Sequence, residues 1–174
     1  MSELVPITPE KYGSRRWQRY TSYSFAATTS YAPLVAAELQ RAMQNMPLAF
    51  IRQGQNFHIA AVLSLSPGDN LFVDHQGRWL GGYVPSMFRG HPFKLAKLQD
   101  QDKLVLCVDE ASGLISDTGG EPFFDENSEL ARPVREVREF LEKVAQNSVA
   151  TQRAVNALAE AGVLASWQVK IEIG

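Results

Sequence analysis

Several features that would decide the class of this protein are scarce or missing from its 174 residues. The single cysteine, Cys107, excludes an internal disulfide framework and a cysteine-rich zinc site. No apolar run approaches the length of about 18 residues that suggests a membrane-spanning helix. The N-terminus has its basic residues after its apolar ones, and so lacks the pattern of a secretory signal. The sequence therefore predicts a cytoplasmic protein without a membrane span.

Neither sign of charge is in large excess. The formal net charge is -2, from 17 Lys or Arg and 19 Asp or Glu, which excludes a generally basic surface for binding nucleic acid. The acidic residues are concentrated, however, because residues 99–129 carry nine of them and one lysine. We interpret this segment as an acidic loop, either solvated beside its own sheet or used to dock a basic partner.

Motifs for phosphate binding, nucleophilic catalysis and metal binding are also missing. There is no GxxxxGK[ST], GxGxxG or GxSxG, and no histidine pair has the spacing of metal ligands. Cys107 lies between Leu106 and Val108, where a thiol is expected to be buried and unreactive. The sequence predicts no catalytic residue, no metal site and no cofactor.

What is present is the composition of a folded domain, with 45% hydrophobic residues. Apolar positions at helical spacing predict a helix over residues 34–46, stopped by Pro47. Apolar runs separated by short polar turns predict an antiparallel sheet. The expected strands are 48–52, 57–65, 70–74, 79–83, 92–98, 104–108 and 167–173. In the turn 75–78, Gly77 is expected to adopt a positive φ.

The C-terminal part predicts two helices within residues 129–164. The first carries Leu130, Val134 and Val137 on one face, and the second runs from about residue 149 to 161, ending at Gly162. The fold class is therefore α+β: an antiparallel, hairpin-rich curved sheet with an N-terminal helix and a C-terminal helix pair. Residues 1–174 are expected to form a single domain.

Two features favour nucleic acid weakly. The first thirty residues contain aromatic side chains of the kind that stack on single strands, namely Tyr12, Trp17, Tyr20 and Tyr23. The second C-terminal helix resembles part of a winged-helix unit, but Arg153 has no second basic residue to support it and Glu160 opposes phosphate. The aromatic residues more often cover a sheet edge, so nucleic acid is disfavoured as a partner.

A series of short motifs runs through the chain in a fixed order. They are Asn-Leu-Phe-Val-Asp at 70–74, Gly-Arg-Trp at 77–79, Tyr-Val-Pro at 83–85, Arg89, Pro92-Phe93, Val108-Asp109 and Gly-Glu-Pro-Phe-Phe-Asp at 120–125. This series resembles the SapC family of bacterial proteins, and the likeness covers nearly all of the chain. Residues 89–93 depart from it by reading Arg-Gly-His-Pro-Phe where the family tends to read Arg-Arg-Tyr-Pro-Phe. The family pattern continues beyond the last expected strand, so we expect the family's C-terminal segment to be missing here.

The resemblance implies no set of catalytic residues. The name of the family implies a link to bacterial surface layers, and its members look like companions of outer-membrane receptors and flavin-dependent halogenases in gene neighbourhoods. The expected function is therefore that of a non-enzymatic accessory or binding protein, associated with cell-surface or outer-membrane uptake systems. A role at the surface would require export by a route that needs no signal of the usual kind.

Two candidate sites follow from the motifs. If the protein binds a protein partner, the aromatic hairpin and the acidic loop would supply Trp79, Tyr83, Phe93 and Asp109. If it is a small-ligand binding protein or an enzyme, Arg78, Arg89 and His91 would line a pocket for a carboxylate or another anion. Arg89 has a structural alternative, an ion pair with Asp109 or Asp125. Self-association through the last expected strand is a further alternative.

Overall fold

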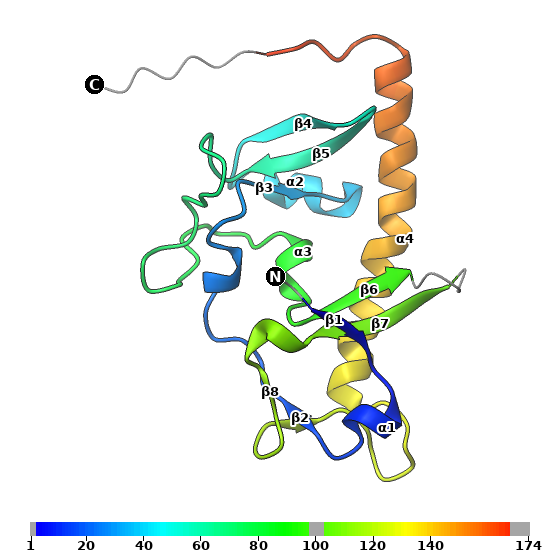
Figure 1. The fold of residues 1–174 in the computed structure, drawn as a ribbon. Helices are drawn as coiled ribbons and strands as arrows, with labels where there is room; N and C mark the ends of the chain where they lie inside the picture. Colours follow the sequence, from blue (N-terminus) through cyan, green and yellow to red (C-terminus); the bar gives the residue numbers. More distant parts are fainter. Residues whose placement is uncertain (1–2, 98–102, 168–174) are drawn as a thin grey trace.

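The computed structural model describes residues 3–97 and 103–167. Within them the strands form antiparallel three-stranded sheets, with orders β3-β5-β4, β1-β7-β6 and β8-β2-β9. The long helix α4 (Arg132–Glu160) runs beside the first two of these sheets (Figure 1). The α+β class and the antiparallel pairing are confirmed, although the strands are distributed over several sheets.

The first sheet contains β3 (Tyr31–Pro33), β4 (Leu48–Gln53) and β5 (Asn56–Val62). The predicted hairpin of β4 and β5 is confirmed, and its turn places Gly54 at φ 62°. The helix expected over 34–46 is shorter: a 3₁₀ turn η2 (Ala36–Glu38) leads into the four-residue helix α2 (Leu39–Ala42). Single turns then carry the backbone to Met46.

The second sheet contains β1 (Leu4–Pro6), β6 (Phe93–Lys97) and β7 (Leu104–Asp109). Strands β6 and β7 were expected, whereas the pairing of β1 with β7 joins segments that are far apart in sequence. The small third sheet has β2 (Arg16–Trp17) between β8 (Ile115–Ser116) and β9 (Glu121–Pro122). The helix α1 (Pro9–Tyr12) and the 3₁₀ turns η1 (Ser24–Ala26) and η3 (Glu110–Ser112) complete these connections.

The hairpin expected over 70–83 is reduced to a tight turn. One antiparallel bridge joins Val73 to Trp79, and the Asp74 carboxylate accepts hydrogen bonds from the backbone N–H of Gln76 (2.9 Å) and Arg78 (2.8 Å). Gly77 has φ 76°, as predicted. The chain then enters a single helical turn, α3 (Ser86–Arg89), which is followed by Gly90.

The predicted C-terminal helix pair is wrong, because α4 is one continuous helix of 29 residues. Two polar side chains near its middle face the rest of the protein. Asn147 accepts a hydrogen bond from the backbone N–H of Ala37 (3.1 Å), and Thr151 accepts one from that of Ala36 (2.8 Å). These side chains accept hydrogen bonds from backbone N–H groups at the start of η2 that have no partner within the turn. The polar residues in this part of α4 therefore form a contact with η2 and do not indicate a linker.

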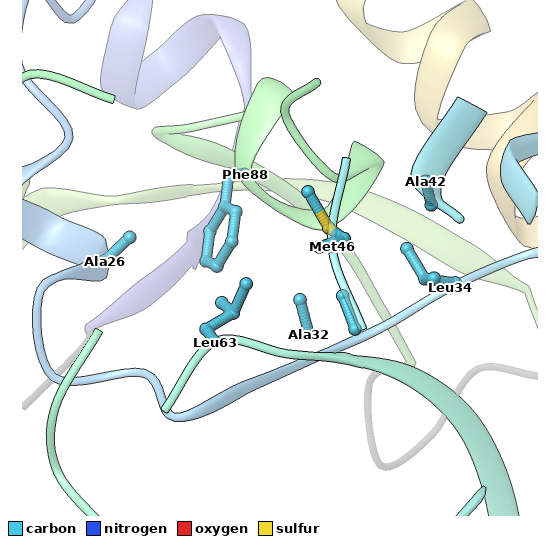
Figure 2. Close-up of a cluster of buried hydrophobic side chains, with 8 residues drawn as sticks. Ala26, Ala32, Leu34, Ala42, Met46, Leu63 and Phe88 are labelled. Atoms are coloured by element: carbon cyan, nitrogen blue, oxygen red, sulfur yellow. The ribbon is translucent and has the colours of Figure 1, made fainter. Parts of the chain in front are cut away.

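Two clusters of buried apolar side chains lie within the described residues. The first surrounds Ala32, Leu63 and Phe88, between η1, the β3-β5-β4 sheet and α3 (Figure 2). The second contains Trp17, Phe93, Val108, Phe123 and Val134, so the start of α4 covers the β1-β7-β6 sheet.

The strand expected over 167–173 lies outside the described residues except for Trp167. None of the helices in the described ranges combines the length and the hydropathy of a membrane span.

Candidate functional site

The carboxylate of Glu38 is buried at the centre of the candidate site, with 4% of the residue exposed. It ends η2 and accepts hydrogen bonds from three residues, Val35 of the same turn and Tyr83 and Ser86 at the start of α3. Oε1 accepts from the Tyr83 hydroxyl and the Ser86 backbone N–H, both at 2.7 Å. Oε2 accepts from the Ser86 hydroxyl at 2.6 Å and the Val35 backbone N–H at 3.1 Å. Hydrogen bonds to a charged carboxylate are strong, and these four offset the desolvation cost of burying it.

Arg89 lies beside this group at the end of α3. Its Nη2 is 3.8 Å from Glu38 Oε1 and donates a hydrogen bond to the Tyr83 hydroxyl at 3.2 Å. The guanidinium also lies 4.9 Å from the ring centroid of Phe140 on α4. The proposed ion pair with Asp109 or Asp125 is thus replaced by one with Glu38. Packing on Phe140 holds the guanidinium in place, and the Arg89 side chain remains 40% exposed.

Tyr83 completes the hydrogen-bonded group as a donor. Burial, with a further contribution from the hydrogen bond to Glu38, raises the pKa of Tyr83 to about 12. The positive charges of Arg89 and Arg41 act in the opposite direction and are smaller effects. The hydroxyl therefore keeps its proton at neutral pH and donates a hydrogen bond to the carboxylate.

A cavity of about 500 Å³ opens beside these residues, between η2, α2, α3 and α4. We call it the Arg89 cavity, and its lining is Val35, Ala37, Glu38, Gln40, Arg41, Tyr83, Ser86, Arg89, Phe140, Lys143, Val144 and Asn147. The lining brings together three cations and one carboxylate. Because three cations face one carboxylate, the lining has a net positive charge. Such a surface is suited to an anion.

The structure does not bring the three predicted anion-binding residues together. Arg89 lines the Arg89 cavity, but neither Arg78 nor His91 belongs to that lining. The Arg78 guanidinium pairs with Asp74 at 2.7 Å in the exposed turn. The His91 ring stacks on Phe25, with centroids 3.8 Å apart and planes 12° apart. Burial lowers the pKa of His91, an effect that outweighs the opposite influence of Asp109.

The four residues predicted to contact a partner have different positions. Phe93 is 1% exposed and belongs to the second buried cluster. Trp79 is half-buried against Phe72 and Phe88, and its indole N–H donates to the Tyr83 carbonyl at 2.8 Å. The Asp109 carboxylate accepts from the backbone N–H of Glu3 at 2.9 Å. Of the four, Tyr83 is the one that reaches the Arg89 cavity.

The acidic loop is largely paired with the N-terminal segment. Glu110 accepts hydrogen bonds from Tyr12 at 2.8 Å and Lys11 at 3.0 Å. Arg15 lies 3.2 Å from Asp117, and Arg19 lies 3.1 Å from Glu121. The Tyr12 hydrogen bond, followed by that from Lys11, lowers the pKa of Glu110. This arrangement matches the interpretation in which the sheet region neutralises the loop.

Two further expectations concern buried side chains. Cys107 is 1% exposed, and burial raises the pKa of its thiol, as expected for an unreactive cysteine. Tyr12 and Trp17 are fully buried, so they are not a stacking surface for nucleic acid.

No group of three potential metal ligands gathers within residues 3–97 and 103–167.

Sequence reasoning identified Arg89 but missed most of its surroundings. Arg41, Phe140 and Lys143, which line the same cavity, were not among the predicted site residues. Glu38 had a signal that could have found it. It lies three residues after Val35 and four before Ala42, so a carboxylate occupies the apolar face of the expected helix. A charge in that position predicts a buried partner.

Comparison with known proteins gives a family and nothing finer. The family model for SapC matches residues 7–174, which is nearly the whole chain. None of the curated proteins and none of the solved structures compared with it matches.

Proposed function

The chain belongs to the SapC family, and on that premise we propose that it is a non-enzymatic binding protein whose ligand carries an anionic group. The observation that supports this is the Arg89 cavity, where Arg41, Arg89 and Lys143 meet around a carboxylate that is already satisfied. Arg89 contributes most, because Phe140 and Tyr83 orient its guanidinium before any ligand arrives. A preorganised cation loses little side-chain entropy on binding.

Binding of simple carboxylates tests this proposal. We expect butanoate, titrated into the protein and followed by NMR chemical shifts, to perturb the amides of α3 and the α4 segment around Lys143. Arg89→Gln should weaken binding at least tenfold, corresponding to the loss of one charge-assisted contact of about 1.5–3 kcal/mol. Arg132→Gln is the matched control, since Arg132 lies outside the cavity and is 83% exposed. Equal affinities for the two variants would refute the proposal.

A protein partner is the second candidate, and an exposed apolar surface supports it. Leu65, Leu71 and Leu80 are 57%, 67% and 62% exposed on the segment that carries Trp79. Scattered exposed leucines are common, but three on one irregular segment suit a contact with another protein. This surface is where we would place the accessory role that the family resemblance implies.

Cross-linking in the native cells tests the second candidate. A protein captured stoichiometrically by the unmodified chain should be lost when Leu71 and Leu80 are both changed to Asp. Leu104→Asp provides the control, because Leu104 is 52% exposed but belongs to β7. A partner retained by the double variant would exclude this surface as its binding site.

A further inference from the structure

A second, smaller cavity of about 170 Å³ adjoins the Arg89 cavity. The two share Val35, Ser86 and Val144, so they meet along the inner face of α4. The smaller cavity lies between β3, β5 and the second half of α4. Its lining is Pro33, Leu34, Val35, His58, Ile59, Ser86, Met87, Val144, Ser148, Thr151, Gln152 and Val155.

The two cavities differ in charge. The charged residues that line the Arg89 cavity are Glu38, Arg41, Arg89 and Lys143. The lining of the smaller cavity includes no Asp, Glu, Lys or Arg from the described ranges, and its titratable side chain is that of His58. Its apolar walls come from all sides, with Ile59 on β5, Met87 on α3 and Val155 on α4 among them.

Several polar side chains of the smaller cavity already have partners. The Thr151 hydroxyl donates to the Asn147 carbonyl at 2.8 Å and accepts from the Ala36 N–H. The Gln152 amide donates to the Phe57 carbonyl at 2.8 Å. The Ser86 hydroxyl, at the junction, donates to Glu38. An apolar group that enters this cavity therefore leaves these three hydrogen-bonding groups satisfied.

We propose that the ligand is an amphipathic carboxylate, with its anionic head in the Arg89 cavity and an unbranched apolar chain in the smaller cavity. This inference rests on the proposed anion-binding function and deepens it. The chain passes between Val35 and Val144, whose side chains line both cavities and carry no polar atoms to desolvate. The smaller volume of the second cavity, about 170 Å³ against about 500 Å³, favours a narrow chain over a branched or bulky group.

A series of linear carboxylates measures the contribution of the chain. Acetate, butanoate, hexanoate and octanoate are titrated into the full chain and followed by NMR. Each buried methylene is expected to raise the affinity about fourfold until the smaller cavity is full. Beyond that length the gain should stop. Hexylammonium has six carbon atoms, as hexanoate does, but one more apolar carbon and a cationic head. It should still bind at least tenfold more weakly than hexanoate because Arg41, Arg89 and Lys143 repel it.

Variants of the apolar half separate this inference from the proposed function. Met87→Gln keeps the side-chain length but adds a polar group, and should weaken hexanoate at least threefold while leaving acetate unchanged. Val155→Ala enlarges the smaller cavity and should lengthen the preferred chain. Met43→Gln is the control, because Met43 is 65% exposed and lines neither cavity.

The outcomes are distinct. Affinity that depends on Arg89 but not on chain length would overturn the amphipathic ligand and leave the anion site standing. Equal binding of hexanoate and hexylammonium would overturn both, since it would show adsorption to apolar surface. Binding of no carboxylate in the series would also overturn both.

Discussion

Glu38 joins its own turn to residues 83–86 through a single carboxylate. Val35 precedes η2, Tyr83 precedes α3, and Ser86 begins α3, and all three donate hydrogen bonds to it. In the amide of a glutamine, an NH₂ group would replace one of the carboxylate oxygens. This NH₂ donor would face the N–H or O–H donors of the neighbouring residues, at a buried position where water cannot supply an acceptor. The residue is therefore expected to fix the position of α3, and with it Arg89, as well as to stabilise the fold.

Glu38→Gln should lower the free energy of unfolding by about 2–4 kcal/mol, because it breaks a buried charged network. Urea unfolding followed by circular dichroism measures this loss. Glu136→Gln is the matched control: Glu136 is exposed on α4, pairs with Arg132 at 2.9 Å, and should change stability by about 0.5 kcal/mol or less. Losses of equal size would show that the Glu38 network is not important to the fold.

His91 makes stability depend on pH in a defined direction. Because burial lowers its pKa in the folded protein below the usual 6.5, the unfolded chain binds the proton more readily. Stability contributed by neutral His91 is therefore complete above pH 6.5 and is lost as the pH falls towards the lowered value. The groups that face His91 are Asp109, Lys94 and the Tyr20 ring.

Measuring urea unfolding between pH 5.5 and 7.5 should show this decline, and His91→Gln should flatten it. His75→Gln is the control, since His75 is exposed and the ring contacts of His91 are with Tyr20 and Phe25. Glu110 acts in a separate pH range. Because its pKa is lowered in the folded protein, the stability that its carboxylate contributes is lost only as the pH falls through about 4.5 and below. A flat profile for the unmodified protein would contradict the role of His91.

At the scale of elements, α4 determines the geometry of both cavities. Phe140 and Lys143 line the Arg89 cavity, Val155 lines the smaller one, and Asn147 and Thr151 join the helix to η2 between them. These positions keep their spacing only if the helix is continuous. The segment that looked like a break in the sequence is thus the part of the helix on which the site depends.

Gln146→Pro should therefore cost about 3 kcal/mol or more, because proline removes a helical hydrogen bond and clashes with the preceding turn. Gln146 is exposed, so Gln146→Ala should be nearly neutral or slightly stabilising. Urea unfolding of the two variants measures the difference. A proline variant as stable as the alanine variant would indicate two helices with a flexible join, as the sequence suggested.

At the scale of the molecule, α4 packs against two of the sheets, through β5 and β6. Val134 belongs to the second buried cluster, while Val155, also buried, lies towards β5. We therefore expect the two clusters to unfold together. Trp17 lies in the second cluster and Trp79 packs against the first, so each cluster contains or adjoins its own fluorescent reporter.

Leu63→Ala in the first cluster and Val108→Ala in the second should each shift a single unfolding transition, by about 1–4 kcal/mol. The third tryptophan, Trp167, is 83% exposed and is first replaced by Phe. In that background, Trp17→Phe leaves Trp79 as the reporter and Trp79→Phe leaves Trp17. For each variant, the fluorescence midpoint should equal the midpoint from circular dichroism. Two separate transitions, each sensitive to one of the two alanine variants, would mean that the chain folds as two units.

The sequence predicted what local patterns control. The hairpin of β4 and β5, the strands β6 and β7, and the turn at Gly77 follow from alternation and turn residues, and all are confirmed. It failed where a partner comes from elsewhere in the chain. Asn147 falls between the two expected helices, yet it binds the backbone of η2. Lys143 is exposed, but it also lines the Arg89 cavity opposite α3. Arg89 was identified, but its partner Glu38 is 51 positions earlier in the chain.

The pairing of β1 with β7 has a consequence for synthesis on the ribosome. The backbone N–H of Glu3 donates to Asp109, 106 positions further along the chain. Strands β3, β4 and β5, by contrast, have all their sheet partners within residues 31–62. Loop closure over the longer distance costs more entropy and slows folding. The β3-β5-β4 sheet can therefore assemble on the nascent chain while the first strand still waits for its neighbour to be translated.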